Sequence, residues 1–353
     1  MKKILYNIKL SLLFFLLTVP SLVSAADGEI IKEKTISKVY LVNSDAGIDI
    51  RNKYGSVYVT TWDENKIGVE VNIKVHGKNE NAVSKRINSI NIEINPLINL
   101  VSARTIVEEL SSSNNISLEI NYTVKIPKGS GSIKLNNQYG SIIVDKIIGK
   151  TDIECKYGSI TLGELSSNDN NIRIQYSDNS SIGYMKNGIV NAEYSKLKIN
   201  KCGNLSYKSD YTDLTLKEVG NITYNSNYGF LNIASANNIE GNGDYLTLRF
   251  GAINNNFDIN TEYSSIAISN ITAKANNINI VSEFTNMEIK YDAEYSFKFE
   301  FNFEYSNLNA SGLNFQEKKE SNNSSHYKGY YKSNSSNRMN ISSSYGNLKL
   351  IKI

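Results

Sequence analysis

The chain has 353 residues, with 38 basic and 35 acidic side chains and a net charge of +3. This even balance, with no basic stripe along the chain, argues against nucleic acid as a partner. Proline is scarce at 3 residues whereas tyrosine reaches 23, and Asn, Ser and Gly separate the apolar stretches. Aromatic and β-branched residues between turn-forming residues predict an all-β protein.

The first 25 residues have the pattern of a secretory signal peptide. Lys2, Lys3 and Lys9 give a basic start, residues 10–19 are apolar, and small residues at 23–26 offer a cleavage site. An uncleaved membrane anchor is the alternative, but the apolar run is short for a span. We expect residues 1–25 to be removed, no transmembrane segment to remain, and the mature protein to be exported to the periplasm or the cell surface.

Residues 26–130 predict a β region that leads into the repeats. Strands are expected at 38–42 and 48–50, followed by the phrase Tyr54-Gly55-Ser56. Alternating apolar residues then indicate further antiparallel strands, and the stretch near Glu80–Ile90 favours one short helix. Pro127-Lys128-Gly129 ends the region.

From residue 131 onward an aromatic residue recurs, followed by apolar residues at its third and fifth positions. The spacing is 17 to 21 residues up to Tyr305, and the last copy is at Tyr345. A fixed period near 18 predicts a single-chain parallel β-solenoid, in which each coil buries its apolar face against its neighbours. The aromatic positions are Tyr139, Tyr157, Tyr176, Tyr194, Tyr211, Tyr228, Tyr245, Tyr263, Phe284, Tyr305 and Tyr345.

Apolar residues before and after each aromatic residue have opposite parity along a strand. A corner at the two residues after the aromatic one, often Gly-Ser, would let both strands face one interior. The tyrosines should then lie above one another in a column, with coils rising about 4.8 Å each. Such a column is either a structural ladder or an exposed platform on which sugar rings stack.

Near the C-terminus residues 316–338 break the period and are rich in Ser, Asn and Lys. We expect a polar loop or hairpin inserted into the solenoid domain of residues 131–353, with the final coil at Tyr345. The two cysteines, Cys155 and Cys202, fall at different positions of coils two apart, which is too far for a disulfide. Two free thiols are expected, with Cys155 buried.

The order of these features resembles the bacterial "putative adhesin" β-solenoid family of exported proteins, often described as auto-transporter adhesin heads. The resemblance rests on Gly55–Val59 followed by Trp62-Asp63, on Val124–Pro127 before the Gly-Ser-Ile repeats, and on a late Gly before the last apolar strand. The chain departs from the family by placing Ser or Thr after many aromatic residues. The resemblance implies a β-solenoid in the periplasm or at the surface and carries over no catalytic residue.

The residues offer little for catalysis or metal binding. His76 and His326 lie far apart, without the neighbours that zinc or a catalytic triad needs. The enzymatic alternative is a polysaccharide hydrolase or lyase that uses carboxylates on one strand face. Asp210, Asp244 and Glu262 each precede an aromatic residue, with Asp213 nearby. Asp244 and Glu262 fall in adjacent coils, but we interpret them as part of a solvated face that keeps the solenoid soluble.

We therefore predict no enzyme activity, no catalytic, cofactor-binding or metal residues, and no cofactor. The predicted function is an envelope-associated scaffold or adhesion module with an unidentified glycan or protein surface ligand. The alternative is a polysaccharide-active hydrolase or lyase.

Overall fold

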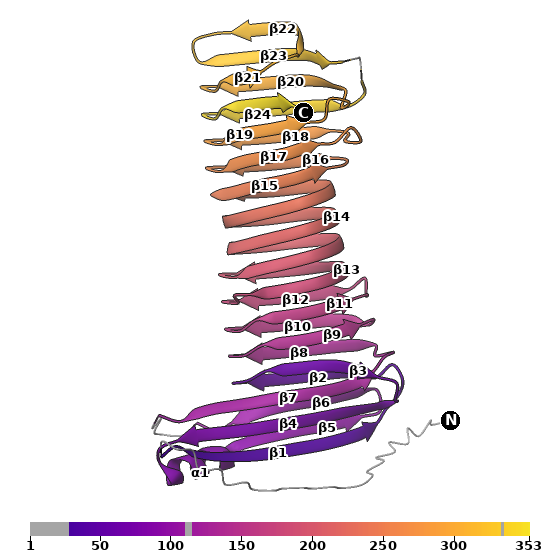
Figure 1. The fold of residues 1–353 in the computed structure, drawn as a ribbon, viewed down its shortest axis with the longest axis vertical. Helices are drawn as coiled ribbons and strands as arrows, with labels where there is room; N and C mark the ends of the chain where they lie inside the picture. Colours follow the sequence, from indigo (N-terminus) through magenta and orange to yellow (C-terminus); the bar gives the residue numbers. More distant parts are fainter. Residues whose placement is uncertain (1–27, 110–114, 333–334) are drawn as a thin grey trace, which may run out of the picture.

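The computed structural model describes residues 28–109, 115–332 and 335–353 and forms a tall column on a wider base (Figure 1). The predicted signal peptide, residues 1–25, lies outside the described residues. Twenty-five strands join in one hydrogen-bonded sheet, accompanied by a single helix among the described residues. The all-β prediction is confirmed. No described helix is both long enough and apolar enough to cross a bilayer.

The base consists of antiparallel strands and the helix. Strand β4 pairs antiparallel with both β1 and β7, and β5 pairs antiparallel with β6. The helix begins where the Asn79 side chain accepts a hydrogen bond from the Ala82 amide at 3.0 Å, and it buries Val83 and Ile87. The elements are β1 (Ile30–Leu41), β2 (Gly47–Lys53), β3 (Val57–Trp62), β4 (Lys66–Gly77), α1 (Glu80–Asn88), β5 (Ile90–Leu97), β6 (Leu100–Val107) and β7 (Ser117–Pro127).

Above the base, equivalent strands of successive repeats pair in parallel. Ile153, for example, lies between Leu135 of one neighbouring repeat and Ile172 of the other. The strands of this column are β8 (Ser132–Gln138), β9 (Ile142–Ile147), β10 (Lys150–Lys156), β11 (Ile160–Leu165), β12 (Asn170–Gln175), β13 (Ser180–Glu193), β14 (Lys196–Asp244), β15 (Leu246–Ile253), β16 (Phe257–Glu262), β17 (Ser265–Ile271), β18 (Ile278–Glu283) and β19 (Asn286–Tyr291).

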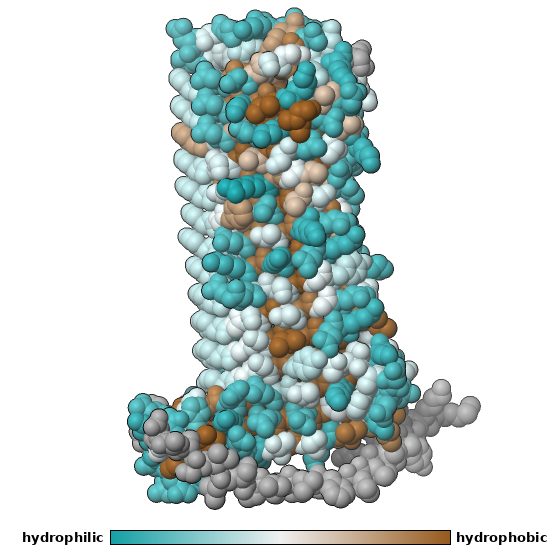
Figure 2. All heavy atoms as spheres, in the orientation of Figure 1, coloured by the Kyte–Doolittle hydropathy of each residue, from teal (hydrophilic) through white to brown (hydrophobic). Residues whose placement is uncertain are grey.

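Alternation along these strands builds one continuous core. In β16 the residues Phe257, Ile259 and Thr261 are buried while the residues between them are exposed. Side chains on one face of a strand recur every second residue, so each repeat contributes a layer of apolar side chains to the interior. Figure 2 shows hydrophilic residues over much of the face in view, with hydrophobic residues in a broken strip along the middle of the column.

At both ends the order of strands in space departs from the order along the chain. Strands β2 and β3 lie between β6 and β7 on one side and β8 and β9 on the other. At the other end, β24 lies between β18 and β20, and β25 between β19 and β21. The remaining elements are β20 (Phe297–Glu304), β21 (Leu308–Ala310), β22 (Asn314–Glu320), β23 (Ser324–Tyr331), β24 (Arg338–Ser344) and β25 (Leu348–Lys352).

This arrangement corrects the expectation that the coils stack in chain order. The repeat containing Tyr345 lies between those of Phe284 and Tyr305, because the chain leaves a gap that its last strands fill. In the stretch where a polar loop or hairpin was expected, β22 and β23 form an antiparallel hairpin, and β23 pairs antiparallel with β20.

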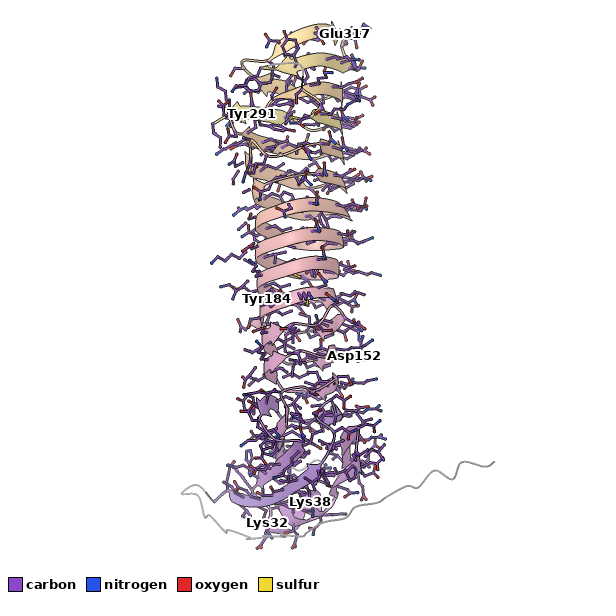
Figure 3. All side chains as sticks on the ribbon, turned by 90° about the vertical axis from the view of Figure 1, so that its right-hand side faces the viewer. Lys32, Lys38, Asp152, Tyr184, Tyr291 and Glu317 are labelled. Atoms are coloured by element: carbon purple, nitrogen blue, oxygen red, sulfur yellow. The ribbon has the colours of Figure 1, made fainter. Side chains whose placement is uncertain are left out.

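The outermost strands carry lysines. Among the described residues β1 pairs only with β4, and β22 only with β23. Figure 3 shows Lys32 and Lys38 of β1 at one end of the molecule and Glu317 of β22 at the other. Lysines on an outer strand disfavour pairing with the edge of another chain, which protects β1 and β22 against such association.

Candidate functional site

The repeated aromatic residues form one uninterrupted column of stacked rings, here named the tyrosine ladder. Adjacent ring centroids are 4.7–5.4 Å apart and the planes differ by no more than 10°. The predicted column is confirmed, and Tyr54 extends it into the base. In spatial order its members are Tyr54, Tyr139, Tyr157, Tyr176, Tyr194, Tyr211, Tyr228, Tyr245, Tyr263, Phe284, Tyr345 and Tyr305.

Each ladder residue is itself the corner of its repeat, with φ between 47° and 64°. The sequence analysis placed the corner on the two following residues, and this was wrong. A residue in the left-handed region reverses the side-chain parity of the strand, which brings the apolar residues on both sides into the core. The backbone ladder continues through the corner, since the Tyr139 amide donates to the Lys156 carbonyl at 3.0 Å.

The residue after each ladder residue is Gly, Ser or Thr, except Leu246 after Tyr245, because the backbone of the next repeat (the next rung) passes close to it. A Cβ atom added to Gly158 would lie 2.0 Å from the Gly140 carbonyl oxygen. Where Ser or Thr occupies this place, its hydroxyl accepts a backbone hydrogen bond from the neighbouring rung, as Ser195 does from the Ser177 amide at 3.1 Å and Thr212 from the Ser195 amide at 3.2 Å. The Ser and Thr residues by which the chain departs from the family pattern therefore maintain a hydrogen bond between neighbouring rungs.

The ladder presents ring edges to solvent. From Tyr139 onward its members are 41–51% exposed. Because each inner ring is stacked on both sides, its faces are covered and no sugar ring can stack on them. The surface available to a ligand consists of phenol hydroxyls and ring edges, so the platform for sugar stacking considered from the sequence is not formed along the ladder.

A row of carboxylates, here named the acidic row, lies directly before the ladder in the distal rungs and is interrupted by Asn227 and Ser344. Asp244 and Glu262 are register partners, and the Glu262 amide donates to the Asp244 carboxylate at 3.0 Å. The predicted adjacency of this pair is confirmed. Asp210 is separated from it by the rung of Asn227, and Asp213 lies beyond the corner. The acidic row comprises Glu193, Asp210, Asp244, Glu262, Glu283 and Glu304.

No member of the acidic row forms an ion pair with another described residue. Desolvation between stacked rings raises the pKa of Tyr194 and of Tyr245, and the adjacent tyrosines and carboxylates raise it further. The row and the ladder thus form one negative, hydroxyl-bearing face.

At the C-terminal end this face becomes a groove of about 640 Å³ where the hairpin of β22 and β23 overhangs it. Glu262 and Glu283 line it from neighbouring strands, Glu304 lines it from β20 beyond Ser344 of β24, and Glu320 and His326 come from the hairpin. Within the groove region the His326 Nδ1 atom lies 2.7 Å from the Asn302 Oδ1 atom. The groove therefore offers carboxylate, hydroxyl and amide groups to a polar ligand.

A second column, of asparagines, was missed in the sequence analysis, which assigned Asn runs only to turns. The side-chain amide of each asparagine after the first donates to the side-chain carbonyl oxygen of the preceding one at 2.5–2.9 Å. Such a ladder joins rungs by side-chain hydrogen bonds in addition to those of the backbone. Its members are Asn168, Asn187, Asn204, Asn221, Asn238, Asn255 and Asn276.

The histidines and cysteines do not assemble a reactive centre. His76 is in the base, 3.6 Å from Glu29, and His326 is at the opposite end. Cys155 and Cys202 are free and buried, as Cys155 was expected to be. Burial raises the pKa of Cys155 to about 11 and that of Cys202 to about 12. Within the described ranges, no three His, Cys, Asp or Glu side chains gather as a metal ion requires.

Comparison with known proteins gives structural similarity only. No family model matches the chain, and no curated protein matches its sequence. A "putative adhesin" from Parabacteroides distasonis is 12% identical, with 73% of this chain and 90% of that chain covered and a TM-score of 0.33. A "putative cell adhesion protein" from Clostridium sporogenes is 12% identical over 91% and 100%, with a TM-score of 0.16. A "putative lipid binding protein" from Parabacteroides distasonis is 10% identical over 91% and 96%, with a TM-score of 0.34.

Proposed function

We propose that the chain is an exported, non-enzymatic binding module of the cell envelope, built as a single-chain parallel β-solenoid. In this proposal residues 1–25 are the signal peptide, residues 26–130 form the base, and residues 131–353 form the solenoid with its hairpin. The basic and apolar start of the sequence supports export. The parallel pairing of equivalent strands in successive repeats supports the solenoid.

One observation carries the proposal of binding: the tyrosine ladder and the acidic row repeat in register along the column and end in the groove. A phenol recurs at every rung of the ladder except that of Phe284, and a carboxylate recurs at most of the distal rungs, with rungs about 4.8 Å apart. A surface with a fixed repeat suits an extended ligand that makes the same contact many times, such as a glycan chain or an extended segment of a surface protein. Many weak contacts then add up along the column.

The adjacency of Asp244 and Glu262 favours a second candidate, a polysaccharide hydrolase or lyase. Two carboxyl groups about 5–10 Å apart can act as the acid and base of glycoside cleavage. Against this candidate, neighbouring rungs carry further carboxylates of the same kind, such as Glu283, so the pair is one member of a series.

A glycan array probed with residues 26–353 tests the binding proposal. We expect retention of extended polar glycans, and we expect the triple variant Glu262→Gln, Glu283→Gln, Glu304→Gln to lose it at least tenfold. The matched control Glu240→Gln, on the same strand face away from the groove, should retain it. Polysaccharide turnover that disappears in Asp244→Asn, Glu262→Gln would refute the non-enzymatic proposal, and failure of every glycan and extended peptide to bind would refute the role of this face.

A further inference from the structure

We propose that the tyrosine ladder is a site of oxidative modification, at which a one-electron oxidant of the haem peroxidase and hydrogen peroxide class couples neighbouring rings into dityrosine bridges. The bridges would join successive repeats covalently. This inference does not depend on the ligand proposed above, because it requires only the arrangement of the rings.

The geometry holds reacting partners together before oxidation. Nine tyrosines, from Tyr54 to Tyr263, follow one another without interruption, and their eight ring pairs have centroids 4.7–5.4 Å apart. The closest pair is Tyr211 and Tyr228, at 4.7 Å with planes 3° apart. Two groups held in contact react as if at very high concentration, so coupling within the ladder should outrun coupling between molecules.

The rings are also accessible to an oxidant. Tyr211 is 51% exposed and Tyr228 is 42% exposed. The rings of a pair lie close and nearly parallel, as for Tyr194, whose centroid is 5.1 Å from that of Tyr176 and 5.0 Å from that of Tyr211. The solvent side of each ring leaves room for the tilt that brings two ortho carbons into bonding distance.

The chemistry balances for each pair. Two phenols each give one electron and one proton to the oxidant, and one hydrogen peroxide accepts both electrons and both protons to form two waters. The two phenoxyl radicals join through a new carbon–carbon bond between their ortho positions. The hydrogen on each of those carbons then moves to the phenoxyl oxygen, which restores both aromatic rings. Each bridge therefore removes two hydrogens from the protein.

The ladder itself supplies an internal control. Phe284 lies between Tyr263 and Tyr345 and has no phenol, so it separates the nine-tyrosine run from the pair of Tyr345 and Tyr305. Tyr184, marked on the column in Figure 3, is partly exposed but stacks on no described aromatic ring. A mechanism that depends on stacking should leave Tyr184 unbridged, whereas oxidation governed by exposure alone would not.

The experiment is to treat the dilute, folded protein with hydrogen peroxide and a haem peroxidase and to map bridged peptides by mass spectrometry, with dityrosine fluorescence as a second readout. We expect bridges between adjacent ladder tyrosines in a chain that remains monomeric on a denaturing gel. Tyr228→Phe should lose the bridges to Tyr211 and Tyr245 and keep that between Tyr194 and Tyr211. Tyr184→Phe should change nothing.

Phe284→Tyr is the decisive gain-of-function variant, since it should create new bridges from position 284 to Tyr263 and to Tyr345. Circular dichroism checks that each variant is folded. The proposal is overturned if bridges join ladder positions that are not adjacent, form equally at Tyr184, arise mainly between chains, or fail to appear at position 284. The absence of any dityrosine in the oxidised wild-type protein would overturn it as well.

Discussion

Replacing Tyr228 with glycine or alanine tests whether the ladder residues are held in the left-handed region at a cost that stacking offsets. Tyr228 has φ of 51° and stacks on Tyr211 at 4.7 Å and on Tyr245 at 4.9 Å. Each aromatic pair contributes about 0.5–1.5 kcal/mol beyond its buried area, so either substitution should lower the free energy of unfolding by about 1–3 kcal/mol.

Glycine should be the less destabilising of the two substitutions, which is the reverse of the usual order in a strand. Alanine keeps the left-handed backbone cost of about 1–2 kcal/mol that glycine escapes. At an ordinary strand position, glycine lowers the free energy of unfolding by about 0.5–1 kcal/mol relative to alanine. The difference leaves Tyr228→Gly more stable than Tyr228→Ala by up to about 1.5 kcal/mol.

Urea denaturation of both variants measures this order. The control is Thr215, an exposed position on the same long strand outside the left-handed residues. There Thr215→Gly should be less stable than Thr215→Ala. If Tyr228→Ala proved more stable than Tyr228→Gly, the corner would not be strained, and our account of why an aromatic residue occupies it would be refuted.

Three further predictions concern the interior and the second ladder. Asn221→Ala removes hydrogen bonds to both neighbouring asparagines and should lower the free energy of unfolding by about 1–2 kcal/mol in urea denaturation; an unchanged midpoint would contradict a stabilising ladder. Gly158→Ala places a Cβ 2.0 Å from a backbone oxygen and should lower the melting temperature far more than Gly68→Ala, where the nearest atom is Cη2 of the Trp62 side chain at 3.3 Å. Burial raises the pKa of the Cys155 thiol from 9.0 to about 11 and that of Cys202 to about 12, so stability should be fully kept below pH 9 and fall as the pH rises from 9 toward 12. Replacing both cysteines with alanine should make urea stability depend less on pH in that range, and an unaltered slope would count against buried neutral thiols.

The repeat period was readable from the sequence because each rung needs the same residue at the same place. An aromatic residue every 17 to 21 positions, with apolar residues three and five places later, predicted the column of Tyr194, Tyr211 and Tyr228. The antiparallel strands of the base and the helix near Glu80 followed from alternation and helical periodicity in the same way.

The sequence did not indicate which residue forms the corner, because a left-handed backbone conformation is usually expected at glycine. A glycine did follow several tyrosines, and the special conformation was given to it instead of to the tyrosine. Stacking between rungs stabilises the aromatic residue in that conformation, and this contact between residues distant in sequence is invisible in a local pattern.

The asparagine ladder had a signal that was overlooked. Asn187, Asn204, Asn221 and Asn238 are spaced by 17 residues, the same interval that relates the nearby tyrosines. Its members were interpreted singly, as turn residues, instead of as a column. Nothing in the sequence indicated that the rung of Tyr345 lies between those of Phe284 and Tyr305. A repeat period predicts the shape of each rung but not the order of the rungs in space.

The placement of β24 has a mechanical consequence. Six residues of this strand have partners on β18 and seven have partners on β20, so it is held on both sides. A force that pulls on β24 must break its hydrogen bonds to β18 and to β20 together, whereas β22 separates once its hydrogen bonds to β23 are broken. Strand β24 thus fills a gap between strands that precede it in the sequence, and the column should resist pulling at this end only once β24 is in place.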